Sequence, residues 1–238
     1  KAIKQALKAE DDGEPRRPRV FVLDFDGDMQ ASQVDQLREE VSAILQVVGE
    51  ADKVLLRLES GGGVVHGYGL AASQLMRLKD AGITLTISVD KVAASGGYMM
   101  ACVGDEIIAA PFAILGSIGV VAQLPNFHRL LKKNDIDFEM HTAGEYKRTL
   151  TVFGENTDKA REKFQADIDD MHVLFKDFVS SNRPVVEIDE VGTGEFWFGQ
   201  RALEKHLADR LCTSDSFLVE HLEGYDLIEV RYRAKRSW

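Results

Sequence analysis

The stretch KVLLRL at residues 53–58 is the strand from which the fold can be worked out. Similar apolar, β-branched runs precede and follow it, at residues 19–25 (RVFVLDF) and 83–89 (ITLTISV). Between these runs, residues 33–48 and 68–81 place apolar side chains at intervals of three and four, which is helical spacing. The alternation of strand and helix predicts an α/β fold with a mainly parallel sheet and crossover helices.

Weaker signals of the same kind continue toward the C-terminus. Apolar runs predict further strands at residues 107–110, 119–122 and 138–142. Periodicity predicts further helices at residues 127–133, 157–181, 198–205 and 215–222. On the long helix, the side chains expected to face inward are Phe164, Ile168, Met171, Leu174, Phe175 and Phe178.

These elements predict one α/β domain over residues 19–220. Residues 1–18 are polar and end in prolines, so we expect a lead or linker segment there. Residues 221–238 are expected to be a C-terminal basic tail, because positive charge gathers in Arg231, Arg233, Lys235 and Arg236. The alternative for this tail is a patch for nucleic acid or lipid headgroups.

Composition narrows the class of protein. The chain has 238 residues, of which 45% are hydrophobic and 29% charged, as in globular proteins and unlike disordered, collagen-like or coiled-coil chains. Its net charge of −10 argues against nucleic acid as a partner. Two cysteines, Cys102 and Cys212, are too few for a disulfide framework or a zinc site, so no metal site is predicted.

Two glycine-rich segments follow predicted strands. Residues 59–64 (ESGGGV) leave backbone N–H groups uncovered and could hold a negative oxygen, although a plain tight turn explains them equally well. In residues 93–98 (AASGGY), small neighbours permit a sharp turn that exposes the hydroxyl of Ser95. The alternative for this segment is close helix packing.

A serine nucleophile needs a base, and the residues leave the choice open. His66 and His141 could serve, but nothing in the pattern selects either of them. Lys147 follows a predicted strand, and burial could favour its neutral form. A solvated surface charge is the ordinary role of such a lysine.

Four segments together resemble the signal peptide peptidase A family of serine peptidases. They are residues 58–63 (LESGGG), 90–98 (DKVAASGGY), 116–120 (GSIGV) and 144–147 (GEYK), in the family's order. The resemblance covers about residues 19–220 and implies the ClpP/crotonase-like spiral α/β fold. It also implies a Ser/Lys dyad, with Ser95 as nucleophile and Lys147 as general base. No cofactor is implied.

The resemblance assigns the remaining site residues as well. The backbone N–H groups of Gly63 and Gly96 would form the oxyanion hole, with Ser117 as a supporting polar group. Gly62, Val64, Val65 and Met99, together with Leu115, would line the binding site of a peptide or protein substrate. The family usually has proline at the position of Gly61, so we expect this loop to be less pre-organised.

The family also implies a setting. We expect a serine endopeptidase that cleaves signal-peptide-like or misfolded membrane and envelope polypeptides through an acyl-enzyme. It would form a homo-oligomeric ring, in which the dyad can be completed between neighbouring chains. No run of 18 apolar residues and no signal peptide is seen, and the first residue is Lys1. We expect the catalytic portion of a longer bacterial inner-membrane protein, held by a segment absent here, with this domain on the periplasmic side.

Two other functions are alternatives to the peptidase. A catalytically weak or silent ring-forming scaffold would fit the altered loop at Gly61. An acyl-CoA hydratase or isomerase on the same fold would need acidic residues beside the glycines, and Glu59 is the one obvious candidate.

Overall fold

The computed structural model describes residues 16–233, and the chain divides into two compact units. Unit 1 combines the chain up to Ile118 with the chain from Phe178 onward, and unit 2 is the stretch between them, Gly119–Asp177. The prediction of one domain over residues 19–220 did not include this division. Most of the expected lead segment, residues 1–15, lies outside the described residues.

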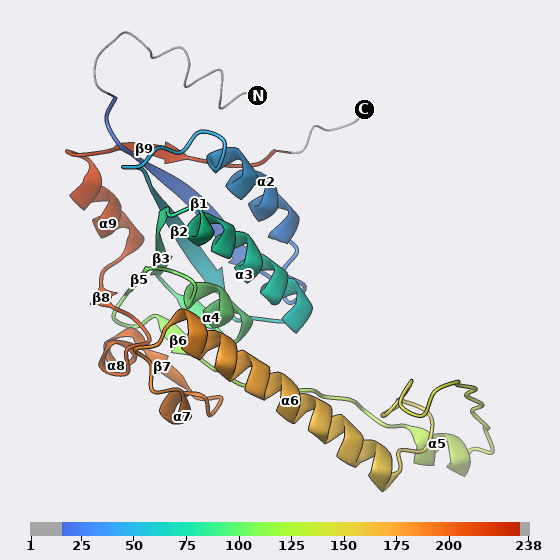
Figure 1. Ribbon diagram of the computed structural model, residues 1–238. Helices are drawn as coiled ribbons and strands as arrows, with labels where there is room; N and C mark the ends of the chain where they lie inside the picture. The colour runs from blue at the N-terminus through green and yellow to red at the C-terminus, as the bar shows by residue number, and fades with distance from the viewer. Residues whose placement is uncertain (1–15, 234–238) are drawn as a thin grey trace. The chain divides into compact units, whose positions relative to one another are not determined.

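Within the described residues, unit 1 is built on a single nine-stranded sheet (Figure 1). Its strands are β1 (Arg19–Gly27), β2 (Lys53–Ser60), β3 (Thr84–Val89), β4 (Val92–Ala94), β5 (Glu106–Ala109), β6 (Ile114–Gly116), β7 (Phe196–Phe198), β8 (Arg210–Leu211) and β9 (Asp226–Glu229). Seven of them follow the order β7-β6-β4-β2-β3-β5-β8, while β1 pairs with β2 and with β9. The β6–β7 pairing is antiparallel and the other pairings are parallel.

Strand β2 changes its neighbour along its length. Residues 53–57 pair with β3, whereas Ser60 at the end of β2 pairs with Ala93 of β4. Strand β4 pairs in turn with β6, where Ala94 lies opposite Gly116. The carboxyl end of β2 therefore lies directly beside the turn that follows β4.

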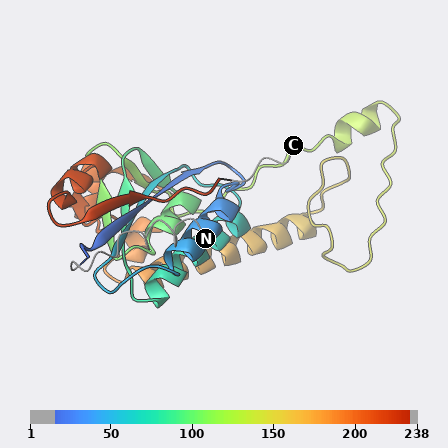
Figure 2. The ribbon, with the colours of Figure 1, turned by 90° about the horizontal axis from the view of Figure 1, so that it is seen from above.

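Helices cover both faces of this sheet (Figures 1 and 2). The helices of unit 1 are α2 (Val34–Ile44), α3 (Val65–Asp80), α4 (Gly96–Ala101), α7 (Ile188–Val191), α8 (Gly199–Glu204) and α9 (Ser214–His221). Val20 and Val22 of β1 alternate with Phe21 and Leu23, and all four are buried, as in a strand enclosed on both sides. Phe217 of α9 packs in one cluster with Val20 and Val22. Helices α2 and α3 lie on the opposite face.

Unit 2 contains α5 (His128–Lys133) and most of α6 (Asp158–Asn182), which continues into unit 1 from Phe178. Aromatic contacts organise its irregular segments: the ring of Phe153 lies 6.2 Å from that of Phe127 and 5.9 Å from that of Phe138. The N–H of Phe127 donates a hydrogen bond of 2.7 Å to Val152. Unit 2 thus packs around a small aromatic cluster and has no strand among the residues described.

Two predicted strands are wrong. Residues 119–122 form no strand, and the strand of this region is β6, which ends earlier at Gly116. Residues 138–142 form none either, because no strand in the described part of unit 2 offers them a partner. Phe138 and Met140 instead line a cavity.

Two further details differ from the sequence analysis. Strand β9 lies inside the stretch expected to be a tail, and it pairs in parallel with β1, Leu227 opposite Val20. On α6, Phe175 is buried as predicted, but Leu174 is 62% exposed, so its predicted inward orientation is wrong.

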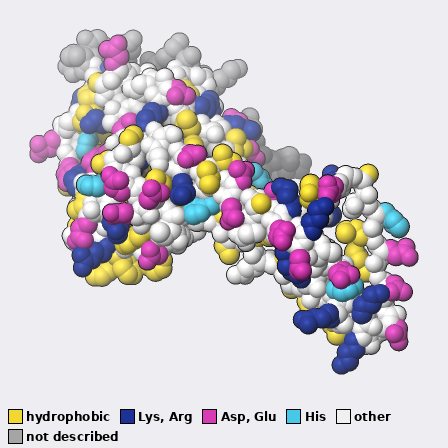
Figure 3. Space-filling model, turned by 60° about the horizontal axis from the view of Figure 1, so that its bottom comes forward, with side chains coloured by type: hydrophobic (Ala, Val, Ile, Leu, Met, Phe, Trp, Pro, Cys, Tyr) yellow, Lys and Arg dark blue, Asp and Glu magenta, His cyan; other side chains and the backbone are white. Residues whose placement is uncertain are grey.

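The described surface carries mixed charge. On the face shown in Figure 3, Lys and Arg side chains are interspersed with Asp and Glu. Among residues 16–233, no helix combines the length and apolar character that crossing a bilayer demands.

Candidate active site

Ser95 occupies the sharp turn between β4 and α4. Its φ of 52° and ψ of −120° lie outside the regions that L-residues ordinarily adopt. The turn is held from two sides: the N–H of Ser95 donates to Gly116 at 2.8 Å, and its carbonyl accepts from Met99 at 3.0 Å. Such strain persists only where the surroundings enforce it, and it is typical of functional positions. The half-buried Ser95 is therefore the leading candidate for a nucleophile.

The small residues after Ser95 are required by close packing. A Cβ at Gly96 would clash with the ring of Tyr68, and one at Gly97 would lie 2.5 Å from the carbonyl oxygen of Ser60. These glycines let α4 begin directly against the end of β2 and the start of α3. The small residues therefore serve close packing, and this packing is compatible with a Ser95 hydroxyl that is reached from solvent.

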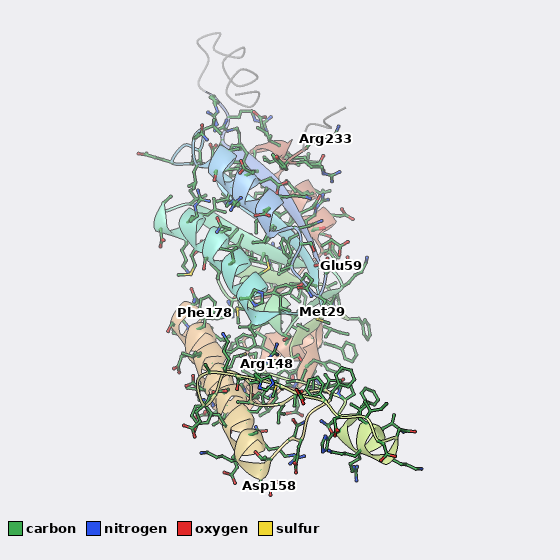
Figure 4. All side chains as sticks on the ribbon, turned by 90° about the vertical axis from the view of Figure 1, so that its right-hand side faces the viewer. Met29, Glu59, Arg148, Asp158, Phe178 and Arg233 are labelled. Atoms are coloured by element: carbon green, nitrogen blue, oxygen red, sulfur yellow. The ribbon has the colours of Figure 1, made fainter. Side chains whose placement is uncertain are left out.

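The glycine loop after β2 lies against the same turn. Gly62 has a φ of +87°, and a Cβ there would lie 2.6 Å from the nitrogen of Gly96 and 2.8 Å from the Cβ of Ser95. A Cβ on Gly63 would overlap the carbonyl of Met29, which accepts a hydrogen bond from Val64 at 2.9 Å. Figure 4 labels Met29, whose carbonyl meets the glycine loop, and Glu59, which lies near the end of β2 before that loop.

Two backbone donors remain free at this point. Within residues 16–233, the N–H groups of Gly63 and Gly96 have no hydrogen-bond acceptor. The N–H of Gly62 is different, since it donates to the hydroxyl of Ser60 at 3.0 Å. The structure thus places Gly62 against Gly96 and Ser95, with Gly63 next along the chain, so free backbone donors occur in both segments that meet at this turn.

Ser60 and Tyr68 support this loop from below, and the sequence analysis missed both. Ser60 Oγ lies 2.5 Å from Tyr68 Oη, and the carbonyl oxygens of Gly27 and Asp28 lie 2.9 Å from Ser60 Oγ and 2.7 Å from Tyr68 Oη. One hydroxyl therefore donates to the other, which in turn donates to its carbonyl. The sequence did offer one clue, since Ser60 follows a predicted strand and Tyr68 begins the predicted helix after it. Side chains at the carboxyl ends of neighbouring parallel strands lie at the same edge of a sheet.

Ser117 follows the end of β6, beside the strand that leads to Ser95. It has a φ of 52°, and its N–H donates to Glu195 at 2.6 Å. Since Gly116 holds the N–H of Ser95, Ser117 is one residue away from the backbone contact of the candidate nucleophile.

Lys147 lies in unit 2, whereas Ser95 lies in unit 1. It is exposed and, among the described residues, makes no ion pair. Its neighbour Glu145 instead pairs with Lys159 at 2.5 Å, and this hydrogen bond lowers the pKa of Glu145. The carboxylate beside Lys147 is therefore already engaged.

A cavity of about 720 Å³ in unit 2 includes Lys147 in its wall. Apolar side chains form most of the lining, and the positively charged or titratable ones are His141, Lys147 and Arg148. Lys147 thus contributes an amine to a mainly apolar wall. This arrangement could not be seen from its spacing in the sequence.

The residues expected to contact substrate differ in exposure. Val65 is 40% exposed and Val64 is half-buried, so both can meet a ligand. Met99 is 7% exposed and offers little surface. Leu115 is fully buried in the core, so its predicted place in the wall of a binding pocket is wrong.

A carboxylate and a thiol that could offer other chemistry in unit 1 are the ion-paired Glu59 and the buried Cys102. Glu59, which acyl-CoA chemistry would need, is paired with Lys91 at 2.9 Å. Burial raises the pKa of the Cys102 thiol to about 12, so this thiol is not an activated nucleophile. Within residues 16–233, no three His, Cys, Asp or Glu side chains are grouped to hold a metal ion.

Comparison with known proteins identifies the family of the chain. The sequence profile of Peptidase family S49 matches residues 77–226, and the profile of the Peptidase family S49 N-terminal region matches residues 1–75. The chain belongs to peptidase family S49. Family S49 is thus shown by two profiles that together cover nearly all of the chain.

Curated relatives within S49 are closely similar. The chain is 60% identical over 218 residues to "Probable protease SohB" of Haemophilus influenzae, covering 92% of this chain and 62% of that protein. It is 66% identical over 202 residues to the protein of the same name in Buchnera aphidicola, covering 85% of this chain and 66% of the relative. The chain thus spans less than two thirds of the length of these relatives.

Solved structures show the same fold. The substrate-peptide complex of a lysine-to-alanine mutant of the 1510-N membrane-bound stomatin-specific protease matches with a TM-score of 0.59 at 12% identity. The match covers 93% of this chain and 95% of that one. A serine-to-alanine mutant of that protease matches with a TM-score of 0.56 at 15% identity, covering 93% of this chain and all of the other. The predicted ClpP/crotonase-like α/β fold class is confirmed.

Proposed function

We propose that this chain carries the catalytic part of a serine endopeptidase that works through a Ser/Lys dyad. The observation that carries the proposal is the strained turn at Ser95, flanked by the free N–H groups of Gly63 and Gly96. Membership of family S49 supports the same activity. A silent scaffold would need neither the strained turn nor the free donors.

In the proposed reaction, Ser95 Oγ attacks the carbonyl carbon of the scissile peptide bond. Lys147 Nζ accepts the hydroxyl proton as the C–O bond forms, and the carbonyl oxygen becomes the oxyanion that Gly63 and Gly96 stabilise. The C–N bond then breaks, and the lysine returns the proton to the leaving amine. Water repeats the sequence on the acyl-enzyme and releases the acid.

Lys147 needs a water-poor setting to act as a neutral base. Within unit 2 it is exposed, so that setting has to come from contact with the surroundings of Ser95. We propose that this contact forms in a homo-oligomeric ring, in which a neighbouring chain can complete the dyad. Ser117 is the proposed hydrogen-bond partner of the lysine.

The proposed substrates are signal-peptide-like or misfolded membrane and envelope polypeptides. Exposed Val65 and half-buried Val64, beside Gly62, would contact apolar side chains of an extended peptide. The proposed site of action is the bacterial inner membrane, with this domain on the periplasmic side.

Labelling with a fluorophosphonate tests the function directly, because the probe reacts only with an activated serine. We expect stoichiometric modification at Ser95, none in Ser95→Ala, and full labelling in the control Ser73→Ala, whose hydroxyl bonds only within α3. A wild-type chain that resists labelling at every pH up to about 9 would instead support the silent scaffold. Saturable binding of an acyl-CoA would support the hydratase or isomerase alternative.

A further inference from the structure

Tyr68 touches both halves of the proposed oxyanion hole. It lies near the start of α3 and is fully buried, so its position is fixed by packing on all sides. Its hydroxyl reaches the glycine loop through Ser60, whereas its ring supports the first residue of α4.

The hydroxyl side of Tyr68 forms a continuous chain of hydrogen bonds. Tyr68 Oη lies 2.5 Å from Ser60 Oγ, and Ser60 Oγ accepts the N–H of Gly62 at 3.0 Å. Because each hydroxyl carries one proton, either Tyr68 donates to Ser60 and Ser60 donates to the carbonyl of Gly27, or Ser60 donates to Tyr68 and Tyr68 donates to the carbonyl of Asp28. In both cases the chain ends on the backbone at the end of β1 or just after it. Linked hydrogen bonds of this kind strengthen one another in a buried setting. Gly62 is thereby held, and with it the orientation of the next residue, Gly63.

The ring side of Tyr68 sets the other donor. A Cβ on Gly96 would collide with the Tyr68 ring, so the backbone of Gly96 rests directly on that ring. Gly61, in contrast, has no heavy atom within 4 Å of its Cβ position. As a glycine it also lacks the pyrrolidine ring with which proline would fix φ. The loop therefore needs an external restraint, and Tyr68 with Ser60 is placed to supply it.

We propose that Tyr68 is a positioning residue that fixes the spacing of the Gly63 and Gly96 N–H groups, with Ser60 as the link. The proposal rests on the proposed peptidase function. Tyr68 does not touch the reacting atoms and acts only through the backbone of the two donors. Its hydroxyl remains protonated at neutral pH, because burial, aided by the charges of Asp28 and Asp26, raises the pKa of Tyr68.

The test compares two tyrosine-to-phenylalanine variants of the full chain. Tyr68→Phe keeps the ring against Gly96 and removes the link to Ser60. Tyr98→Phe is the matched control, since Tyr98 is equally buried and its hydroxyl donates to Leu207 at 3.1 Å, away from the glycine loop. Fluorophosphonate labelling rates, kcat and KM for an apolar peptide, and thermal unfolding midpoints are measured for each.

We expect Tyr68→Phe to lower kcat and the labelling rate by about 10- to 100-fold while KM stays within about twofold, because the donors act on the transition state. Tyr98→Phe should keep kcat within about twofold, whatever its effect on unfolding. Replacing Gly61 by proline in the Tyr68→Phe chain should recover part of kcat by restraining the loop. Unchanged kcat in Tyr68→Phe, or an equal loss in both variants, overturns the proposal.

Ser60→Ala provides a second route if Tyr68→Phe does not fold. It removes the acceptor of the Gly62 N–H and should produce the same fall in kcat with KM preserved. A Ser60→Ala chain with wild-type kcat overturns the proposal. A wild-type chain that is not labelled at Ser95 overturns the peptidase function and this role with it, whereas equal labelling of wild type and variants overturns the positioning role alone.

Discussion

The N–H of Ser95 donates a 2.8 Å hydrogen bond to the carbonyl oxygen of Gly116. This bond joins the turn after β4 to the end of β6. The residues on both sides of the bond have positive φ angles. The φ angles are 52° at Ser95, 100° at Gly116 and 52° at Ser117. The unusual conformation of the candidate nucleophile is therefore enforced by a neighbouring strand, so a change in that strand should alter the reactivity of Ser95.

Gly116→Ala should test this dependence. A Cβ at this position would lie 2.9 Å from the Trp197 ring in a backbone conformation that favours glycine, so the end of β6 has to move. We expect fluorophosphonate labelling at Ser95 to slow by about 10-fold or more. Gly82→Ala is the control, because Gly82 has a φ of +73° but open space around it. An equal loss of labelling in both would mean that general destabilisation, and not the contact with Ser95, is responsible.

Alanine should be far more harmful at Gly62 than at Gly61. Gly62→Ala brings a Cβ within 2.6 Å of the Gly96 nitrogen at a φ of +87°, which should push the two loops apart. We expect kcat to fall about 10²-fold or more, the cost of losing one oxyanion donor. Gly61→Ala meets no atom within 4 Å and should retain most of the activity. Steady-state kinetics on one apolar peptide measures both, and similar losses would argue against the contact between Gly62 and Gly96.

Lys147→Met should remove the proposed base and leave both units folded. Because Lys147 is exposed and unpaired among the described residues, the free energy of unfolding should change by less than about 0.5 kcal/mol. Labelling of Ser95 should slow by about 10²- to 10⁴-fold, the usual contribution of a general base. Lys133→Met, at the end of α5, should label normally. Full labelling of the Lys147→Met chain would exclude a lysine base at this position.

Mixing two inactive chains tests the proposed ring. A Ser95→Ala chain retains Lys147, and a Lys147→Met chain retains Ser95. If neighbouring chains complete the dyad, mixed oligomers should regain labelling on the Lys147→Met chain, as shown by mass spectrometry of the labelled peptide. Analytical ultracentrifugation checks that the chains exchange. Exchange without recovered labelling would place the dyad within one chain.

The ion pair between Asp24 and Arg57 predicts a pH-dependent stability. Arg57 holds Asp24 by two hydrogen bonds of 2.6 and 2.9 Å across β1 and β2. Burial acts to raise the pKa of Asp24, but Arg57, with help from Arg231, outweighs it and leaves that pKa below its ordinary value. This contribution to stability is therefore present above the unfolded pKa and is lost as the pH falls through the folded one.

Asp24→Asn should accordingly lower the free energy of unfolding by about 1 kcal/mol at pH 7, as for a partly exposed pair. The difference from wild type should shrink as the pH falls below about 4. Urea titrations at both pH values measure this, with Asp35→Asn as the control because Asp35 is 76% exposed in its pair with Arg38. A difference that persists at low pH would assign the loss to packing.

The sequence predicted the long buried strands because they pack on both faces and so carry continuous apolar runs. It missed β4, and it placed the neighbouring strand at residues 119–122 when β6 ends at Gly116, because strands of three residues are too short to show a pattern. Strand β9 was not predicted because its four residues begin and end with acidic side chains and carry no long apolar run. Its pairing with β1 is made by backbone groups, which the side-chain pattern does not reveal.

The candidate site was predictable only in part. The spacing around Ser95 and the glycine loop is local, and the structure brings these segments together. The support from Ser60 and Tyr68 could not be predicted, because it depends on how tightly β2, α3 and α4 pack. The link between Ser95 and Lys147 rests on the family resemblance, and it remains a prediction.

Unit 2 is a single uninterrupted stretch of chain, whereas unit 1 is assembled from two. One exchange of coding sequence between residues 119 and 177 would therefore replace Lys147 and the whole cavity around it in a single genetic event. Every strand register of the sheet lies outside that stretch and would be inherited intact. The segment that carries the proposed base can therefore be exchanged as one block, while the sheet that carries Ser95 keeps its strand pairings.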